Sequence, residues 1–311
     1  MTTETLPNAV RGWNRPLLVL TAATAVLTVV TAVGIVTDSR IVTGAPVWLK
    51  PFKFAVSFAI YGFTLAWLLS VLPRRSRPAE WAAALIFGVS VIELAIITVQ
   101  AGRGRMSHFN ETTPLDAQLF AIMGASIMVL FMAHVAISVV ALRQRIGDRA
   151  VTYAIRSGLL LSVLGLLAAV PMVSGATDRG EENITGGHSV GVADGGPGMP
   201  LTGWNLTGGD LRIGHFVGLH GLQALPLLAF LLSRYFGQRL DTDTRARLLL
   251  VAGAAYGVLV MLLTWQALRG QPLLRPDALT LTALAALVAA TGLATAAVLR
   301  TRRRQDLELA A

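Results

Sequence analysis

Long apolar stretches separated by short polar ones dominate the chain. Eight of them reach the length of about 20 residues that a helix needs to cross the hydrocarbon core of a bilayer. They cover residues 16–36, 52–73, 81–101, 116–142, 153–175, 212–236, 246–267 and 278–299. The pattern predicts an all-α, multi-pass membrane bundle that forms one transmembrane domain over residues 1–311, because almost nothing is left for a soluble domain.

Composition supports the same class of protein. Hydrophobic residues make up 54% of the chain and charged residues only 14%, and the mean hydropathy is +0.63. A soluble domain of this length carries roughly a quarter charged residues. The first apolar stretch is too long for a signal-peptide core, so we expect it to be a retained transmembrane helix.

The net charge of +9 is distributed unevenly over alternate loops. One set of loops holds 17 of the 26 basic residues. Because Lys and Arg stay on the cytoplasmic side of membrane proteins, both termini are predicted to be cytoplasmic. Topology therefore explains the basic excess, and no nucleic-acid partner is needed. The 17 residues are Arg11, Arg15, Arg74, Arg75, Arg77, Arg143, Arg145, Arg149, Arg156, Arg234, Arg239, Arg245, Arg247, Arg300, Arg302, Arg303 and Arg304.

Residue usage indicates where the protein resides. The chain has no cysteine, which excludes disulfides and thiolate metal ligands. Arginine outnumbers lysine by 24 to two, and alanine, glycine and valine are abundant. This usage is typical of a GC-rich bacterial genome, so the predicted location is a bacterial plasma membrane.

The segment 176–211 differs from the other connections. It is about 36 residues long, contains ten glycines, and lies on the extracytoplasmic side by the charge argument. Loops of this length are uncommon in compact proteins unless they are functional or disordered. Turn-forming residues alternate with apolar ones, which predicts a folded cap over the bundle. Asp210 is the expected N-cap of the helix that follows, and Asp194 and Asp210 are candidate substrate-binding residues.

Two ionisable residues lie at matching depth inside the predicted helices. Glu93 is about nine residues from the extracytoplasmic end of its helix, and His220 is about eight residues from its own. At 1.5 Å per residue, both lie roughly 12–14 Å below that surface. Gln100 shares a helix face with Glu93, and Gln223 shares one with His220. We expect a Glu93–His220 pair, with the alternative that each residue bonds a separate neighbour.

Lys50 and Lys53 open the second predicted helix on the extracytoplasmic side, against the general charge bias. One interpretation is that these long side chains extend to the membrane interface. The other is that they bind an anion such as phosphate or carboxylate, together with Arg103 and backbone N–H groups of the glycine-rich loop.

Histidines near the extracytoplasmic rim are candidate bases or metal ligands. His108 lies in a short polar loop with Ser107 and Asn110, but neighbouring side chains in sequence usually point apart, so a catalytic Ser-His pair is weakly indicated. His215 and His220 are five residues apart, which is wrong for a helical zinc site. Zinc or heme would need His108, His188 and His215, and no cofactor is firmly predicted.

Three motifs resemble a widespread, functionally uncharacterised family of bacterial polytopic membrane proteins. They are Trp-Leu-Lys-Pro-Phe-Lys-Phe-Ala at 48–55, Gly-Arg-Met-Ser-His-Phe-Asn with Thr-Pro-Leu-Asp at 104–116, and the run from Gly187 to Pro200 continued by Gly-Asp-Leu-Arg-Ile-Gly-His-Phe-Val-Gly-Leu-His at 209–220. The resemblance covers most of the chain from the second to the sixth predicted helix. It implies a polytopic membrane fold and no particular activity.

Three functions are compatible with these observations. The first is an intramembrane enzyme that acts on a lipid or anionic substrate, with Glu93, His220, His108 and His215 as catalytic candidates. Its substrate-binding candidates are Lys50, Lys53, Gln100, Arg103, Asn110, Asp194, Asp210 and Gln223. The second is a proton-coupled transporter in which Pro171 and Pro226 break two helices. The third is a structural or partner-binding membrane protein.

Overall fold

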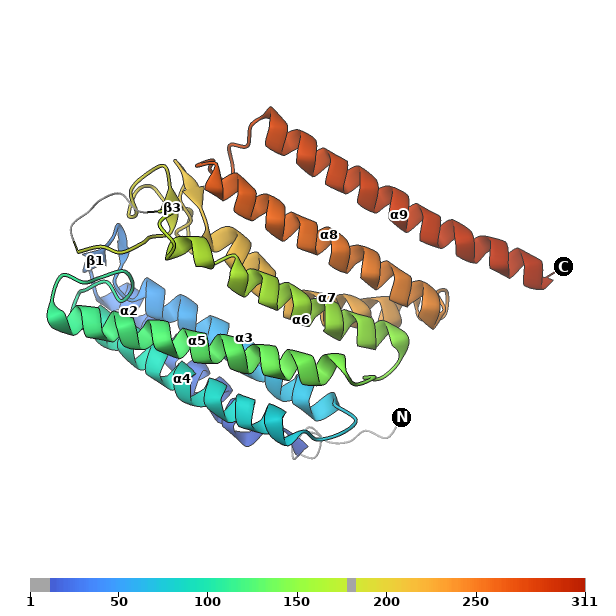
Figure 1. The fold of residues 1–311 in the computed structure, drawn as a ribbon, viewed down its shortest axis with the longest axis horizontal. Helices are drawn as coiled ribbons and strands as arrows, with labels where there is room; N and C mark the ends of the chain where they lie inside the picture. The colour runs from blue at the N-terminus through green and yellow to red at the C-terminus, as the bar shows by residue number, and fades with distance from the viewer. Residues whose placement is uncertain (1–11, 178–182, 311) are drawn as a thin grey trace. The chain divides into compact units, whose positions relative to one another are not determined.

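The computed structural model describes residues 12–177 and 183–310, with the side chains of residues 303–310 left aside. Within these residues, eight helices are long and apolar enough to cross a membrane, so the chain is a multi-pass, all-α membrane protein in contact with the lipid bilayer (Figure 1). They are α2 (Arg15–Thr37), α3 (Leu49–Val71), α4 (Arg77–Gly102), α5 (Pro114–Leu142), α6 (Arg149–Leu167), α7 (Arg212–Phe236), α8 (Thr242–Leu268) and α9 (Ala278–Ala310). The predicted number of spans is confirmed.

The chain forms two compact units, each holding four of these helices. Unit 1 is Met1–Gln144 with Glu182–Ile184, and unit 2 is Arg145–Glu181 with Thr185–Ala311. The expectation of one transmembrane domain stays a prediction. Each unit is described by itself below.

In unit 1, α2 packs against α3 and α4 packs against α5. Strands β1 (Ile41–Val42) and β2 (Ala45–Pro46) form a short antiparallel turn between α2 and α3. The helix starts follow from local sequence. The side chain of Asn14 accepts a hydrogen bond from the Leu17 N–H at the start of α2, and Thr113 accepts one from the Asp116 N–H at the start of α5.

In unit 2, α6 packs closely against α7 and both contact α8, whereas α9 lies mainly against α8 (Figure 1). Glycines allow the α6–α7 approach: a Cβ atom on Gly218 would lie 2.4 Å from the Cα atom of Gly165. Strands β3 (Ser189–Val190) and β4 (Gly209–Asp210) pair antiparallel beside the end of α8. Small residues at the crossing are how membrane helices pack without a hydrophobic driving force between them.

Three local expectations are corrected by the structure. The fifth predicted helix, expected to reach residue 175, ends at Leu167 and is followed by a 3-10 turn, Val170–Met172, because Pro171 has no N–H for the carbonyl four residues earlier. Helix α7 continues through Pro226 instead of breaking there. The N-cap of α7 is Leu211 rather than Asp210, although the Asp210 carboxylate accepts a hydrogen bond from the Arg212 N–H.

Candidate functional site

A fully buried carboxylate organises the loop between α4 and α5 in unit 1. Asp116 Oδ1 accepts hydrogen bonds from Gln100 Nε2 and Arg103 Nη1, both at 2.9 Å. Its Oδ2 accepts from Arg105 Nη1 at 2.6 Å and Thr113 Oγ1 at 2.7 Å. Asp116 is therefore shared by two guanidiniums, that of Arg103, an expected anion ligand, and that of Arg105, and the three side chains together keep a net positive charge. Asp116 is not among the candidate residues predicted from the sequence; the available signal was the pair of arginines in the preceding loop.

Glu93 is the buried carboxylate of unit 1 that lacks such partners. It lies on α4 with 3% of its surface exposed. Its Oε1 atom has no hydrogen-bond partner among the described residues. Lys50, at the start of α3, is the charged group that interacts electrostatically with it. Leaving such an oxygen buried and unbonded costs free energy, which makes the position a functional candidate.

Ser90 lies one helical turn from Glu93 on the same buried face of α4. Its hydroxyl also has no partner among the described residues, although the residue is completely buried. Other helical hydroxyls of this chain donate to a carbonyl one turn earlier, as Thr64 and Ser138 do. Glu93 Oε1 and Ser90 Oγ are therefore two buried polar atoms, one helical turn apart in sequence, for which the described residues supply no hydrogen-bond partner.

The polar loop after α4 contains a hydrogen-bonded serine and histidine. Ser107 Oγ lies 3.0 Å from His108 Nδ1, so the expectation that these neighbours point apart is wrong. The His108 ring packs against Phe54 with a centroid separation of 5.6 Å. Phe109 has a φ of 60°, a strained conformation for a bulky residue. The Asn110 side chain holds the loop by donating to the Met106 carbonyl.

Unit 2 holds the predicted rim histidine His215 on α7. Its Nδ1 lies 2.7 Å from the carbonyl oxygen of Gly165. A carbonyl can only accept, so Nδ1 carries the proton and Nε2 of the neutral ring carries the lone pair. The Gly165 carbonyl is available because the last turn of α6 tightens and the Ala169 N–H bonds Leu166 instead. His215 therefore also caps α6.

His220 and Gln223 share a face of α7, as expected, with His220 Nδ1 3.3 Å from Gln223 Oε1. Glu93 lies in unit 1 and His220 in unit 2, and the direct pairing of the two stays a prediction. No group of three His, Cys, Asp or Glu side chains gathers as a metal site in the part of the chain that the structure describes. Zinc and heme at His108, His188 and His215 likewise stay predictions.

Two aspartates hold the segment 183–211 together. Asp194 Oδ2 accepts from the His188 N–H and lies 3.1 Å from His188 Nδ1, and its Oδ1 accepts from the Ser189 N–H. Burial raises the pKa of Asp194, but these hydrogen bonds and the His188 charge hold it well below its usual range. Asp210, 1% exposed, accepts from the Asn205 N–H at 2.8 Å and from Arg212 Nε at 2.9 Å. Both carboxylates are thus engaged in folding the segment.

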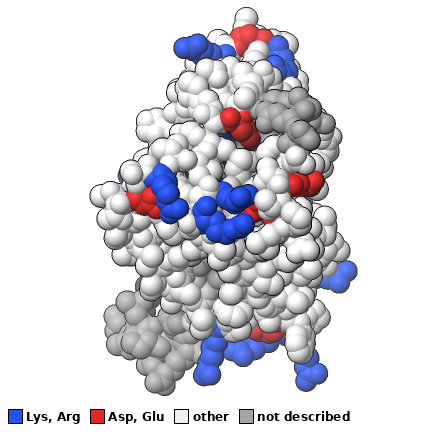
Figure 2. Space-filling view, turned by 90° about the vertical axis from the view of Figure 1, so that its left-hand side faces the viewer, with Lys and Arg blue, Asp and Glu red and all other residues white. Residues whose placement is uncertain are grey.

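Charged side chains at the loop ends of the helices occur in pairs. Arg40 contacts Asp38 at 2.6 Å in unit 1, and Arg269 contacts Asp277 at 2.6 Å in unit 2. Hydrogen bonds from Arg40 hold the pKa of Asp38 well below its usual range. On the face that Figure 2 presents, acidic side chains lie next to basic ones rather than forming a field of one sign. Such exposed pairs stabilise little.

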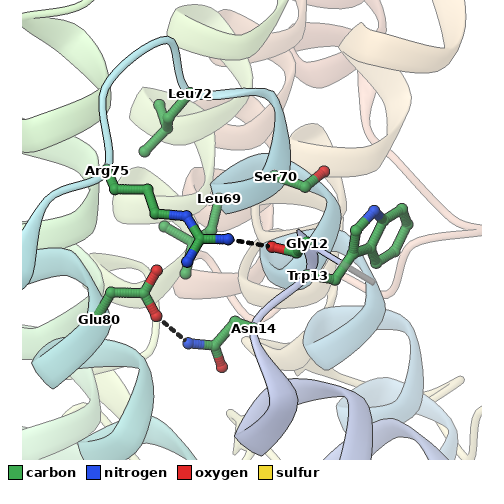
Figure 3. Close-up of a pocket in the computed structure, with 8 residues that line it drawn as sticks. All are labelled: Gly12, Trp13, Asn14, Leu69, Ser70, Leu72, Arg75 and Glu80. Atoms are coloured by element: carbon green, nitrogen blue, oxygen red, sulfur yellow. Dashed lines mark hydrogen bonds between the residues drawn. The ribbon is translucent and has the colours of Figure 1, made fainter. Parts of the chain in front are cut away.

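A cavity of about 210 Å³ lies at the opposite end of unit 1 (Figure 3). Arg75 Nη2 donates to the Gly12 carbonyl at 3.0 Å, and Asn14 Nδ2 donates to Glu80. The sequence did not predict this cavity. Its two hydrogen bonds tie the start of α2 to the α3–α4 turn and to the first turn of α4.

Comparison with protein-family models, with curated proteins and with solved structures finds no match to this chain. The function therefore has to be argued from the chemistry of the residues themselves.

Proposed function

We propose that this membrane protein is a proton-coupled transporter of a small anion, in which Glu93 is the proton site. The observation that carries the proposal is the buried Glu93 carboxylate with an unbonded oxygen, under the influence of Lys50. Ionisable groups inside transmembrane helices are costly, and they mark ion and proton pathways by default.

The coupling follows from electrostatics. An ionised Glu93 places a negative charge in the field of Lys50, and protonation removes that charge. The positive potential around Lys50 then rises, whatever other contacts Lys50 makes, and an anion binds more tightly. By linkage, anion binding raises the proton affinity of Glu93 to the same degree. Proton and anion would thus enter the site together, as in a symporter.

The Glu93→Gln variant tests this function because glutamine imitates the protonated side chain. Infrared difference spectra recorded across a titration from acid to alkaline pH should contain a carboxyl band that the variant lacks. In proteoliposomes, uptake of labelled phosphate or acetate should depend on a pH gradient in the wild type and lose that dependence in the variant. Glu80→Gln, at the opposite end of unit 1, serves as the control. Unchanged gradient dependence in Glu93→Gln would reject the proposal.

The second candidate function is an intramembrane enzyme acting on a lipid or anionic ester, and the Ser107–His108 hydrogen bond favours it. Ser107 Oγ would attack the ester carbonyl carbon while its proton passes to His108 Nδ1. The ester C–O bond would then break, and the leaving alcohol would take that proton. A fluorophosphonate probe should label the wild type and not Ser107→Ala, with Ser138→Ala as the control. Equal labelling of Ser107→Ala would reject this function.

We also propose a membrane location and a family for this protein. The distribution of arginines supports cytoplasmic N- and C-termini, and residue usage supports a bacterial plasma membrane. The three motifs at 48–55, 104–116 and 187–220 support membership of the bacterial polytopic family that they resemble.

A further inference from the structure

Arg245, in the first turn of α8, is a buried guanidinium with few partners. Its side chain is 11% exposed. Its Nη2 donates one hydrogen bond, to Thr242 Oγ1 at 3.1 Å. Its Nε is buried and has no hydrogen-bond partner among the described residues. A guanidinium has five N–H donors, and among the described residues the side chain of Arg245 has one hydrogen-bond acceptor, while its buried Nε has none.

The acidic side chains near Arg245 do not supply hydrogen-bond acceptors for its guanidinium. Its nearest carboxylate, Asp148, is 3.7 Å away, beyond hydrogen-bond length. Asp148 also caps α6 by accepting from the Val151 N–H at 2.8 Å. Asp243 is paired with Arg149 at 2.9 Å, and Asp241 caps α8 through the Thr244 N–H at 2.7 Å. Each of these carboxylates already has another role.

The placement of Arg245 has no structural explanation in its own helix. The first turn of a helix carries the positive end of the helix dipole, which disfavours a cation and favours an anion. Helix α6 also begins at this end of unit 2, since its first-turn Arg149 contacts Asp243 of α8. Two helix starts and an under-bonded guanidinium, beside carboxylates that are already engaged, together favour a further anionic acceptor where the transmembrane helices leave the hydrocarbon core.

We propose that Arg245 binds the phosphate of an anionic phospholipid headgroup at this end of unit 2. A phosphate diester offers acceptor oxygens for the unused guanidinium N–H groups, and charge-assisted bonds of this kind are the strong ones. Headgroup phosphates lie at the depth where transmembrane helices end, and basic sites between helices are known to bind them. The proposal does not depend on Glu93 or on the transport function.

The test compares the thermal unfolding midpoint of the full-length protein in two kinds of nanodisc. One kind contains phosphatidylcholine alone, and the other contains phosphatidylcholine with 30% phosphatidylglycerol. The wild type should be stabilised by phosphatidylglycerol. Arg245→Gln should lose that increment, whereas Arg247→Gln, an exposed arginine on the same helix, should keep it. Because each variant is compared with itself in two lipids, a general loss of stability in Arg245→Gln does not affect the result. Arg245→Lys should retain part of the increment.

A titration of the detergent-solubilised protein identifies the source of the phosphate. Short-chain phosphatidylglycerol should bind about tenfold more weakly to Arg245→Gln than to the wild type, as expected for the loss of a hydrogen bond to a charged group. Inorganic phosphate at equal concentration should not compete. If it competes fully, the site binds soluble phosphate and the lipid assignment is wrong. If Arg245→Gln and Arg247→Gln respond alike in both measurements, the site does not exist.

Discussion

Buried carboxylates in this protein differ in the hydrogen bonds that their surroundings provide. Asp116 is fully buried and receives hydrogen bonds from Gln100, Arg103 and Arg105. Glu93 is almost as buried, yet one of its oxygens receives none among the described residues. Buried polar groups are normally satisfied, so Asp116 is a structural residue, whereas Glu93 needs a functional explanation.

Asp194 should make the segment 183–211 sensitive to acid. The pKa of Asp194 is depressed in the folded protein, so its ionised form stabilises the fold at neutral pH. That contribution should decline as pH falls below about 4, the pKa of a free aspartate. Asp194→Asn should lower the free energy of unfolding by about 1–2 kcal/mol at pH 7. The difference in thermal midpoint between the two proteins should therefore narrow as pH falls from 4 to 3, and part of it should remain at pH 3 because the pKa of Asp194 in the folded protein lies well below its usual range.

The matched control is Asp243→Asn, which breaks the exposed Arg149–Asp243 pair. Because exposed ion pairs contribute little, this variant should shift the midpoint only slightly at any pH. A constant difference between wild type and Asp194→Asn across the pH range would contradict the role assigned to the ionised Asp194.

At the scale of elements, α6 and α7 are held together by contact between backbones. A Cβ atom on Gly165 would lie 2.4 Å from the Leu219 nitrogen, and one on Gly221 would lie 2.6 Å from the Leu161 Cβ. The same contact brings His215 to the Gly165 carbonyl. The glycines therefore position a candidate functional side chain as well as packing the helices.

Gly218→Ala should separate α6 from α7, because its Cβ has no room. We expect a loss of about 1–3 kcal/mol, as for other overpacked sites, measured by denaturation in mixed micelles. Gly88→Ala is the control, since a Cβ there would meet nothing within 4 Å. It should be neutral or stabilise by up to about 1 kcal/mol, because alanine favours helix over glycine. Equal effects of the two substitutions would show that crowding at Gly218 is unimportant.

At the scale of the whole molecule, the two units differ in how their helices pack. Unit 1 is built from the pairs α2–α3 and α4–α5, whereas α6, α7 and α8 of unit 2 contact one another mutually. Helix α9 lies mainly on α8, and none of its transmembrane window is buried within the protein. In a bilayer lipid covers this window, which explains why the window is apolar on all sides.

The absence of cysteine makes the membrane orientation directly testable. Single cysteines at Thr43, Leu201 and Gln238 each replace an exposed residue between helices. With both termini cytoplasmic, a membrane-impermeant maleimide added to intact cells should label Thr43→Cys and Leu201→Cys. Gln238→Cys should react only after the cells are opened. The reverse pattern would invert the proposed topology.

The sequence by itself determined the class of protein and the positions of its helices, because membrane insertion depends on the length and polarity of local segments. The start of α7 at Arg212 and its end at Phe236 coincide with the prediction. The end of α6 did not, since a proline that is tolerated within α7 ends the regular helix of α6. Whether a proline ends a helix or is tolerated within it therefore depends on how neighbouring helices pack around it.

Only the tertiary structure decided which polar side chains are satisfied. Sequence spacing put Glu93 and Gln100 on one face of α4, but it did not show that Asp116 would engage Gln100 and Arg103 while Glu93 Oε1 has no partner among the described residues. Sequence spacing also did not predict the hydrogen bond between Ser107 and His108. Nor did it predict that, among the described residues, the Arg245 side chain donates one hydrogen bond. Hydrogen bonds depend on the positions of donor and acceptor atoms to within a few tenths of an ångström, a precision that helical periodicity does not carry.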